Sequence, residues 1–190
     1  MGATRPRSMS KLRITGGEWR SRLIRVADTP GLRPTPDRVR ETLFNWLGQD
    51  LTGWRCLDLF AGSGILGIEC ASRGAEEVVL VERDQGAFAR LKQNVAAFDS
   101  TRLKPVRGDA LEFAAPVATA QQDGRFDLLL LDPPYRQGWL ERVAPLLNSV
   151  TVPDARIYAE AEHRIESLGD FRVIRQGQAG QVFYHLLEHA

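Results

Sequence analysis

The 190-residue chain has little cysteine, little histidine and no long apolar run. Its two cysteines, Cys56 and Cys70, each lie in an apolar stretch, and its three histidines lack partners at any metal-motif spacing. Two cysteines at that spacing form neither a disulfide framework nor a zinc site. We therefore expect buried, reduced thiols, no metal and a cytoplasmic location.

Membrane-targeting signals are also missing. No apolar run approaches the roughly 20 residues of a membrane span. The first eleven residues carry charge but no hydrophobic stretch of the kind found in signal peptides. We therefore expect a soluble protein with no membrane partner, and a monomer is the default expectation.

Charge is unevenly distributed, although the formal net charge is only +1. Residues 1–40 hold ten basic and three acidic residues, a net charge of +7, whereas the other 150 hold 15 basic and 21 acidic residues, a net charge of −6. A basic arm on a mildly acidic body favours a polyanionic partner such as nucleic acid. A solvated, partly disordered tail is the alternative interpretation.

The N-terminal region divides from the rest by composition. We expect a flexible tail at residues 1–10, a basic hairpin with a proline-rich connector at 11–34, and the main domain at 35–190. Lys11–Thr15 and Arg22–Val26 can form short strands around Gly16-Gly17. In the helix that follows, Thr35 is expected to be the N-cap and Pro36 the first helical residue.

From residue 56 onward, apolar strands alternate with helical patterns. Strands are expected at 56–60, 78–81, 103–106, 126–131, 156–160, 171–175 and 181–187, and helices at 65–72, 88–98, 111–113 and 140–147. Such alternation predicts an α/β, three-layer, doubly wound sheet with helices on both faces. The last two strands have no clear helix between them, so they can pair antiparallel.

A glycine-rich turn after the first of these strands predicts a cofactor site. Gly62, Gly64 and Gly67 satisfy G-x-G-x-x-G, and Glu82 follows Gly62 by twenty positions, where an acid binds ribose hydroxyls. This pattern alone fits NAD, FAD or S-adenosylmethionine. Asp58 would repel a pyrophosphate, and an acid at Asp109 can accept a hydrogen bond from the adenine amino group, although it can also be only a helix N-cap.

S-adenosylmethionine is therefore the expected cofactor, because it has no phosphate and carries cationic groups. The residues expected to bind it follow the first three strands of the main domain: Asp58, Phe60, Ala61, Gly62, Ser63, Gly64, Glu82, Arg83, Asp109 and Ala110.

Asp132-Pro133-Pro134-Tyr135 closes the fourth of these strands and is the expected catalytic loop. Two prolines fix two φ angles and make the loop stiff. Asp132 and the Pro133 carbonyl can accept both hydrogens of an exocyclic amine, and Tyr135 can stack on the ring that carries it. The loop therefore suits a flat amine, and it resembles the Asp/Asn-Pro-Pro-aromatic signature of amino-group methyltransferases.

The chain resembles family D of the bacterial 16S rRNA guanine-N2 methyltransferases, within the class I S-adenosylmethionine-dependent methyltransferases. The resemblance spans nearly the whole chain from Lys11, and its most specific part is the Arg-Pro-Thr-x-Asp-Arg-Val-Arg-Glu block at 33–41. The other segments that carry it are 16–20, the rest of 32–47, the glycine motif and 179–182. Ile65-Leu66 departs from the smaller residues expected there, a change that we interpret as packing.

The resemblance implies methyl transfer to N2 of one guanine in small-subunit rRNA, with the 30S subunit or an assembly intermediate as partner. It also implies a seven-stranded sheet whose last strand is antiparallel. Arginines of the arm are expected to bind RNA phosphates and fix register without reading sequence: Arg20, Arg22, Arg33, Arg38 and Arg40.

Three alternatives remain open. The catalytic loop fits adenine N6 in DNA or a protein glutamine equally well. A NAD-dependent oxidoreductase would need a hydride-transfer acid or base and usually a second domain. A non-catalytic RNA-binding assembly factor would have no need of an intact Asp-Pro-Pro-Tyr loop.

Overall fold

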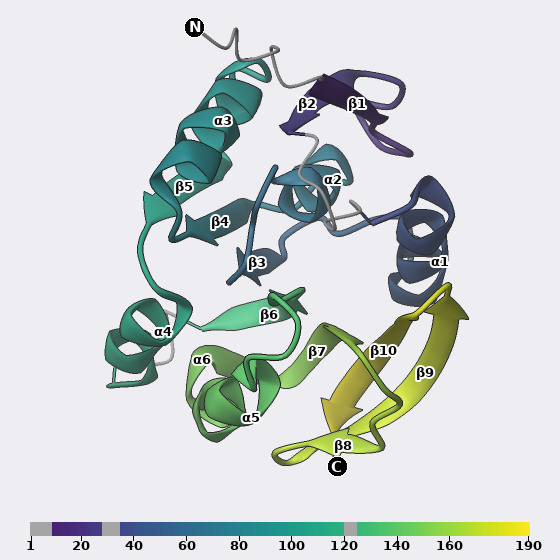
Figure 1. Ribbon diagram of the computed structural model, residues 1–190, viewed down its shortest axis with the longest axis vertical. Helices are drawn as coiled ribbons and strands as arrows, with labels where there is room; N and C mark the ends of the chain where they lie inside the picture. Colours follow the sequence, from purple (N-terminus) through teal and green to yellow (C-terminus); the bar gives the residue numbers. More distant parts are fainter. Residues whose placement is uncertain (1–8, 28–34, 120–124) are drawn as a thin grey trace, which may run out of the picture.

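The computed structural model is an α/β protein with a small hairpin at one end (Figure 1). It describes residues 9–27, 35–119 and 125–190. Within these ranges no helix is both long and apolar enough to cross a bilayer. The expected fold class is confirmed.

A mixed sheet of eight strands forms the middle layer, in the order β5-β4-β3-β6-β7-β10-β9-β8. The first five are parallel, and β10 pairs antiparallel with both β7 and β9. The expectation of seven strands missed the two-residue edge strand β8. The bounds are β3 (Arg55–Asp58), β4 (Glu77–Glu82), β5 (Leu103–Arg107), β6 (Phe126–Leu131), β7 (Thr151–Ala161), β8 (Ser167–Leu168), β9 (Phe171–Ala179) and β10 (Val182–His189).

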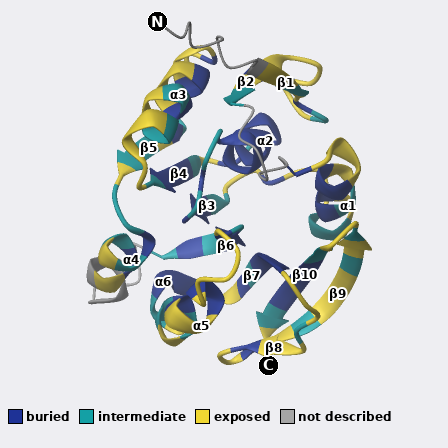
Figure 2. Cartoon of the chain, in the orientation of Figure 1, coloured by how far each residue is buried: buried dark blue, intermediate teal, exposed yellow. Residues whose placement is uncertain are grey.

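Helices cover both faces of the sheet, and each face has its own apolar core. One core packs α1 (Asp37–Leu47), α2 (Ile65–Ser72) and α3 (Gln85–Ala96) against the sheet. The other packs α4 (Ala110–Thr119), α5 (Trp139–Val143), a 3-10 turn at Ala144–Leu146 and α6 (Leu147–Val150). Helix α2 is buried throughout, whereas β9 and the outer side of α3 are largely exposed (Figure 2). Ile65 and Leu66 are buried there, which supports the packing interpretation.

The N-terminal hairpin pairs β1 (Met9–Arg13) with β2 (Leu23–Ala27) in antiparallel register. Met9 and Ser10 therefore belong to a strand, and the expected tail extended two residues too far. The backbone of Arg25 exchanges hydrogen bonds with the amide of Asn94 on α3 (3.1 and 2.9 Å), and that amide also donates to the Ser63 carbonyl (2.9 Å). The hairpin is thus fastened to the glycine-rich loop.

The loop of the hairpin docks on the C-terminal end of α2. Gly17 has a φ of +78°, and a Cβ there would lie 1.9 Å from the Ser72 carbonyl oxygen. The Trp19 amide donates to the Ser72 hydroxyl (2.9 Å), which donates to the Gly16 carbonyl (2.6 Å). The Trp19 ring is 5% exposed and lies 4.6 Å from the Phe98 ring. The loop therefore needs glycine for its close approach.

Helix α1 begins differently from the expectation. Pro36 is the N-cap and no side chain caps the helix, so Thr35 does not cap it. The Thr35 hydroxyl instead donates to Glu160 Oε1 at the end of β7 (3.0 Å). A threonine in this position usually accepts a hydrogen bond from a backbone amide in the first turn of the helix. Here its hydroxyl is bound to Glu160, far along the sequence, instead.

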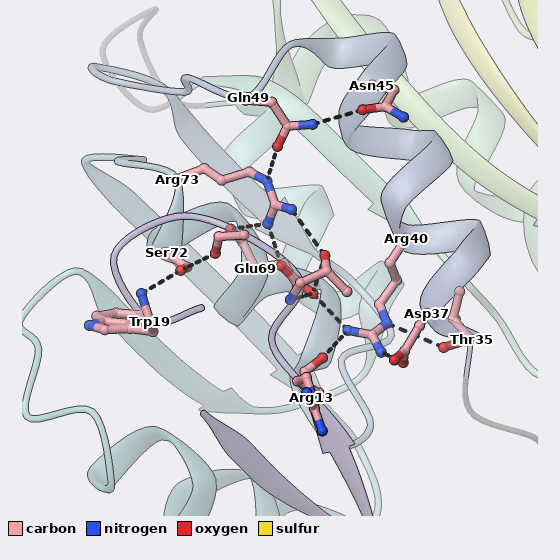
Figure 3. Close-up of polar contacts among 12 residues, drawn as sticks. Arg13, Trp19, Thr35, Asp37, Arg40, Asn45, Gln49, Glu69, Ser72 and Arg73 are labelled. Atoms are coloured by element: carbon pink, nitrogen blue, oxygen red, sulfur yellow. Dashed lines mark hydrogen bonds and ion pairs between the residues drawn. The ribbon is translucent and has the colours of Figure 1, made fainter. Parts of the chain in front are cut away.

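A buried ion cluster ties the hairpin, α1 and α2 together (Figure 3). Glu69 on α2 pairs with Arg40 on α1 (2.6 Å) and with Arg73, and it accepts from both the amide and the hydroxyl of Thr15. Arg40 also donates to the Arg13 and Thr35 carbonyls and pairs with Asp37. The Arg40 and Glu69 side chains have no solvent exposure. Buried charges of this kind are tolerable only when paired and hydrogen-bonded.

Truncating Arg40 tests whether this cluster is structural. Arg40→Ala leaves the Glu69 carboxylate buried without one of its cations, a change that typically costs about 3–5 kcal/mol. We expect urea denaturation to show a loss of that size in the free energy of unfolding. The matched control, Arg38→Ala, removes an exposed arginine of the same helix and should stay within about 0.5 kcal/mol of the unaltered protein. Equal stability of the two variants would contradict a structural role for Arg40.

Candidate functional site

A cavity of about 980 Å³ opens at the carboxyl ends of the parallel strands. Strand order reverses between β3 and β6, because the chain proceeds outward from β3 through β4 to β5 and returns to β6 on the other side. Open α/β sheets bind ligands at such a switch point. Asp58 is the last residue of β3, and Asp132 is the first residue after β6. The topology therefore brings the glycine motif and the Asp-Pro-Pro-Tyr loop to one cavity.

Asp58 lies at the bottom of the cavity and is 2% exposed. Its Oδ1 accepts from the Phe60 amide (3.3 Å). Burial raises the pKa of Asp58 to about 7, and the Glu82 and Glu160 carboxylates add to the rise. A cation beside this carboxyl group would favour its ionised form. The site is therefore electrostatically suited to a positively charged ligand.

Glu82 holds the glycine-rich loop in place. Its Oε2 accepts from the Gly62 amide (2.9 Å) and its Oε1 from the Asp84 amide (2.7 Å). Gly62 has a φ of +54°, and the space beyond its missing Cβ is free of other atoms within 4 Å. Backbone can therefore approach a ligand closely here. Phe60, Ala61 and Ser63 also line the cavity.

Asp109 has two roles. Its Oδ1 accepts from the Leu111 and Glu112 amides and so caps α4, as the alternative interpretation held, while its Oδ2 lies 3.7 Å from Arg83 Nη1. Both oxygens belong to a residue that lines the cavity, together with Arg83 and Ala110. A helix cap and a ligand contact are compatible, because a carboxylate has about four acceptor positions.

Gly64 behaves differently from the other expected cofactor residues. It lies behind the cavity wall, with a φ of +86°, and a Cβ there would lie 2.5 Å from Leu91 Cδ1. Gly67 is similarly close to Leu80. These two glycines allow α2 to pack tightly on the sheet and on α3, and they do not line the cavity.

The catalytic loop lies across the cavity from the glycine motif. Pro133 is buried, Asp132 is half-buried, and the Tyr135 ring is 43% exposed at the rim. Trp139 is buried, and its ring makes an edge contact with the Phe60 ring (5.4 Å between ring centres). The loop therefore presents one carboxyl group inside and one aromatic ring outside.

Asp132 forms part of a carboxyl cluster that sequence reasoning missed. Glu160, the residue before the last one of β7, shares a hydrogen bond with Asp132, and its Oε1 accepts from the hydroxyls of Thr35 (3.0 Å) and Tyr158 (2.7 Å). Burial raises the pKa of Asp132 well above its ordinary value, and the carboxylates of Glu160 and Asp58 raise it further. The sequence signal available for Glu160 was an acidic residue at the end of the strand expected at 156–160.

The expected RNA-binding arginines have different environments. Arg20 and Arg38 are exposed, and Arg22 is exposed with its guanidinium over the Phe98 ring (4.3 Å). Arg33 lies outside the described residues. Arg40 was wrongly assigned to RNA binding, because its guanidinium is completely buried among Glu69, Asp37 and two carbonyl groups.

Two further arginines line the cavity without having been expected there, Arg25 on β2 and Arg90 on α3. The turn between β9 and β10 also lines the cavity, through residues 179–182. The sequence marked this segment only as a point of resemblance to the family. Arg25 lies in the arm whose charge excess was evident, but only the docking of β2 on α3 brings it to the cavity.

S-adenosylmethionine fits these residues. Asp58 and Glu82 supply negative charge where the ligand is cationic and carries ribose hydroxyls, the Gly62 backbone is open to close approach, and Asp109 can accept from an adenine amino group. Three of these residues, Asp58, Glu82 and Asp109, are acceptors, and the buried Asp58 carboxyl would oppose a pyrophosphate.

Comparisons with known proteins agree with this geometry. The family model "Conserved hypothetical protein 95" matches residues 12–188. The "Ribosomal RNA small subunit methyltransferase D" of Escherichia coli K12 is 40% identical over 183 residues, covering 94% of this chain and 90% of that protein. A solved structure, the "putative methyltransferase yhhF" of E. coli, has a TM-score of 0.81 at 39% identity and covers 95% of this chain and 98% of its own.

A more distant structure shares the fold alone. A putative methyltransferase, SMU.776, solved in complex with SAH, has a TM-score of 0.72 at 13% identity and covers 98% of this chain and 57% of its own. The whole-length match to the family model and the cavity together give the conclusion. The chain belongs to the Conserved hypothetical protein 95 family and is an S-adenosylmethionine-dependent methyltransferase.

Proposed function

We propose that the chain methylates N2 of one guanine in the 16S rRNA of the small ribosomal subunit. The observation that carries the proposal is that Asp132, Pro133 and Tyr135 share one cavity with Asp58, Glu82 and Asp109. An amine-binding loop thus faces a site for a cationic methyl donor. The relatives supply the substrate class, because they are named as small-subunit rRNA methyltransferases.

The reaction needs alignment more than it needs a strong base. The guanine N2 lone pair is delocalised into the ring, so the amine is a weak nucleophile. S-adenosylmethionine, when bound, supplies an electrophilic methyl group. Holding the two reactants in line can lower the barrier by about 7–11 kcal/mol. Asp132 and the Pro133 carbonyl would accept the amine hydrogens and so direct the nitrogen lone pair into the cavity.

Methyl transfer moves one electron pair and releases one proton. The N2 lone pair forms the new N–C bond while the methyl carbon–sulfur bond breaks and its electrons stay on sulfur. Positive charge builds on N2, and the carboxyl groups near it stabilise that charge. The amine then loses one proton to the Asp132–Glu160 pair, which carries one negative charge, or to water.

The target base has to leave its stack to reach Asp132. Tyr135, exposed at the rim, is in place to stack on an extruded base. Arg20, Arg22 and Arg38 are exposed, and Arg25 and Arg90 line the cavity, so all five can contact phosphates on the surrounding RNA. The partner in this proposal is the 30S subunit or an assembly intermediate, the protein acts as a monomer, and the compartment is the cytoplasm.

Methyl transfer from labelled S-adenosylmethionine tests the proposal directly. Unmodified small-subunit rRNA, naked and assembled with proteins, would be compared with duplex DNA, and the labelled nucleoside identified by mass spectrometry. We expect N2-methylguanosine at one position. Label on DNA adenine or on protein would leave the methyltransferase in place and overturn the guanine assignment.

Tyr135 should contribute stacking rather than chemistry. Tyr135→Ala removes a contact worth about 1–3 kcal/mol per base, so we expect kcat/KM for rRNA to fall by about 5- to 150-fold. Tyr135→Phe keeps the ring and should stay within about threefold of the unaltered enzyme. A loss as large in the phenylalanine variant would show that the hydroxyl, and not the ring, matters.

The exposed arginines should determine the salt dependence of RNA binding. The double variant Arg20→Gln/Arg38→Gln should raise the KM for rRNA and lower the slope of log affinity against log salt by about 0.7–0.9 per lost phosphate contact. The control variant Arg172→Gln/Arg175→Gln removes the same charge from β9 at the far side of the sheet. Equal slopes in the two double variants would contradict a role for Arg20 and Arg38 in binding RNA phosphates.

A further inference from the structure

Glu160 is the strongest feature of the cavity that the proposed reaction leaves without a role. It is 4% exposed and lines the same cavity as Asp132. Strands β6 and β7 are parallel, with Leu131 opposite Ala159. The next residue along each strand is Asp132 and Glu160, so the register itself places the two carboxyl groups next to each other.

The contacts of Glu160 determine where its charge lies. Oε1 accepts two hydroxyl hydrogens, from Thr35 at 3.0 Å and from Tyr158 at 2.7 Å. Both donors are themselves buried. An oxygen that accepts two such bonds carries negative charge more readily than the Asp132 carboxyl group, to which only the Thr35 hydroxyl, among the donors of this pair, also offers its hydrogen. Glu160 is therefore the ionised partner, and Asp132 holds the proton of the hydrogen bond between them.

Two adjacent carboxyl groups cannot both be ionised without a large repulsion, so they share one proton. Within residues 9–27, 35–119 and 125–190, none of the ion pairs involves Asp132, Glu160 or the nearby Asp58. The shared proton is what lets the pair persist. Because that proton points from Asp132 to Glu160, the lone pairs that remain toward the cavity are acceptors.

We propose that Glu160 is a specificity-determining residue that keeps the shared proton inside the pair, so that the cavity offers only hydrogen-bond acceptors to the base. Guanine presents two adjacent donors, N1–H and the N2 amine, and matches such a surface. Adenine presents its N6 amine beside an N1 acceptor, which would face a carboxyl lone pair. This inference rests on the proposed function and explains which amine is chosen.

The test compares two methyl acceptors that carry the same amine. RNA with 2-aminopurine at the mapped target position keeps the C2 amine but has an acceptor at N1 where guanine has N1–H. A site built for a donor rejects an analogue that lacks it, because its own buried groups are left unpaired. We expect the unaltered enzyme to prefer guanine over 2-aminopurine in kcat/KM by at least about tenfold.

Glu160→Gln should change that preference and spare the fold. The amide oxygen can still accept from Thr35 and Tyr158, and its NH2 group can donate to Asp132 and toward the cavity. We expect the guanine to 2-aminopurine ratio to fall by at least about tenfold, with 2-aminopurine gaining relative to guanine. Glu166→Gln, an exposed position of the same charge, is the control and should leave the ratio unchanged.

Each outcome separates the possibilities. A ratio that is the same in the Glu160→Gln variant and the unaltered enzyme overturns the inference while leaving guanine methylation intact. Failure of the unaltered enzyme to methylate any guanine in rRNA overturns the proposed function instead. If circular dichroism shows that Glu160→Gln is unfolded, Thr35→Val, which removes one donor to Glu160, should lower the ratio in the same direction. An unchanged ratio there would overturn the inference too.

Discussion

The arrangement of the molecule depends on one buried carboxylate, that of Glu69. It pairs with Arg40 and Arg73 and accepts from Thr15, so a single side chain on α2 meets the hairpin, α1 and its own helix end. In an interior of low dielectric constant these attractions are strong, but they offset the desolvation of three charges only if all partners are present. The cluster therefore makes the N-terminal elements an integral part of the domain.

The position of the cavity follows from that arrangement. Arg40 donates to the Thr35 carbonyl, and the Thr35 hydroxyl donates to Glu160. The start of α1 is thus fixed between the structural ion cluster and the carboxyl pair of the site. On the opposite wall, Asn94 joins β2 to the Ser63 carbonyl of the glycine-rich loop. Both walls of the cavity are attached to elements from the first 40 residues.

Local sequence patterns predicted most of the parallel sheet and the site residues that follow its strands. Strand β6 and helix α2 had the expected bounds, because each is a mostly apolar segment with clear turn residues at its ends. The glycine motif and the Asp-Pro-Pro-Tyr loop are contiguous in sequence, so their chemistry could be inferred without a fold.

The predictions that were wrong or incomplete concern residues whose roles depend on contacts between distant segments of the chain. Arg40 belongs to a basic arm by composition, yet its partners lie on another helix, so charge counting assigned it to RNA. Thr35 has the features of a helix cap, but Glu160, 125 positions away, takes its hydroxyl. Glu160 stands in a strand with no motif around it, and only the register of β7 against β6 reveals its neighbour.

The close approach of Gly17 to Ser72 has a consequence for how substrate is chosen. A hairpin seated at backbone contact on α2, with Trp19 buried beneath it, has no freedom to swing. The exposed arginines of the hairpin are therefore held at fixed distances from the cavity. In the proposed reaction, the folded RNA has to place its phosphates at these arginines and the target base in the cavity at the same time. One nucleotide among many identical bases is then selected by the distance and angle between the base and those phosphates.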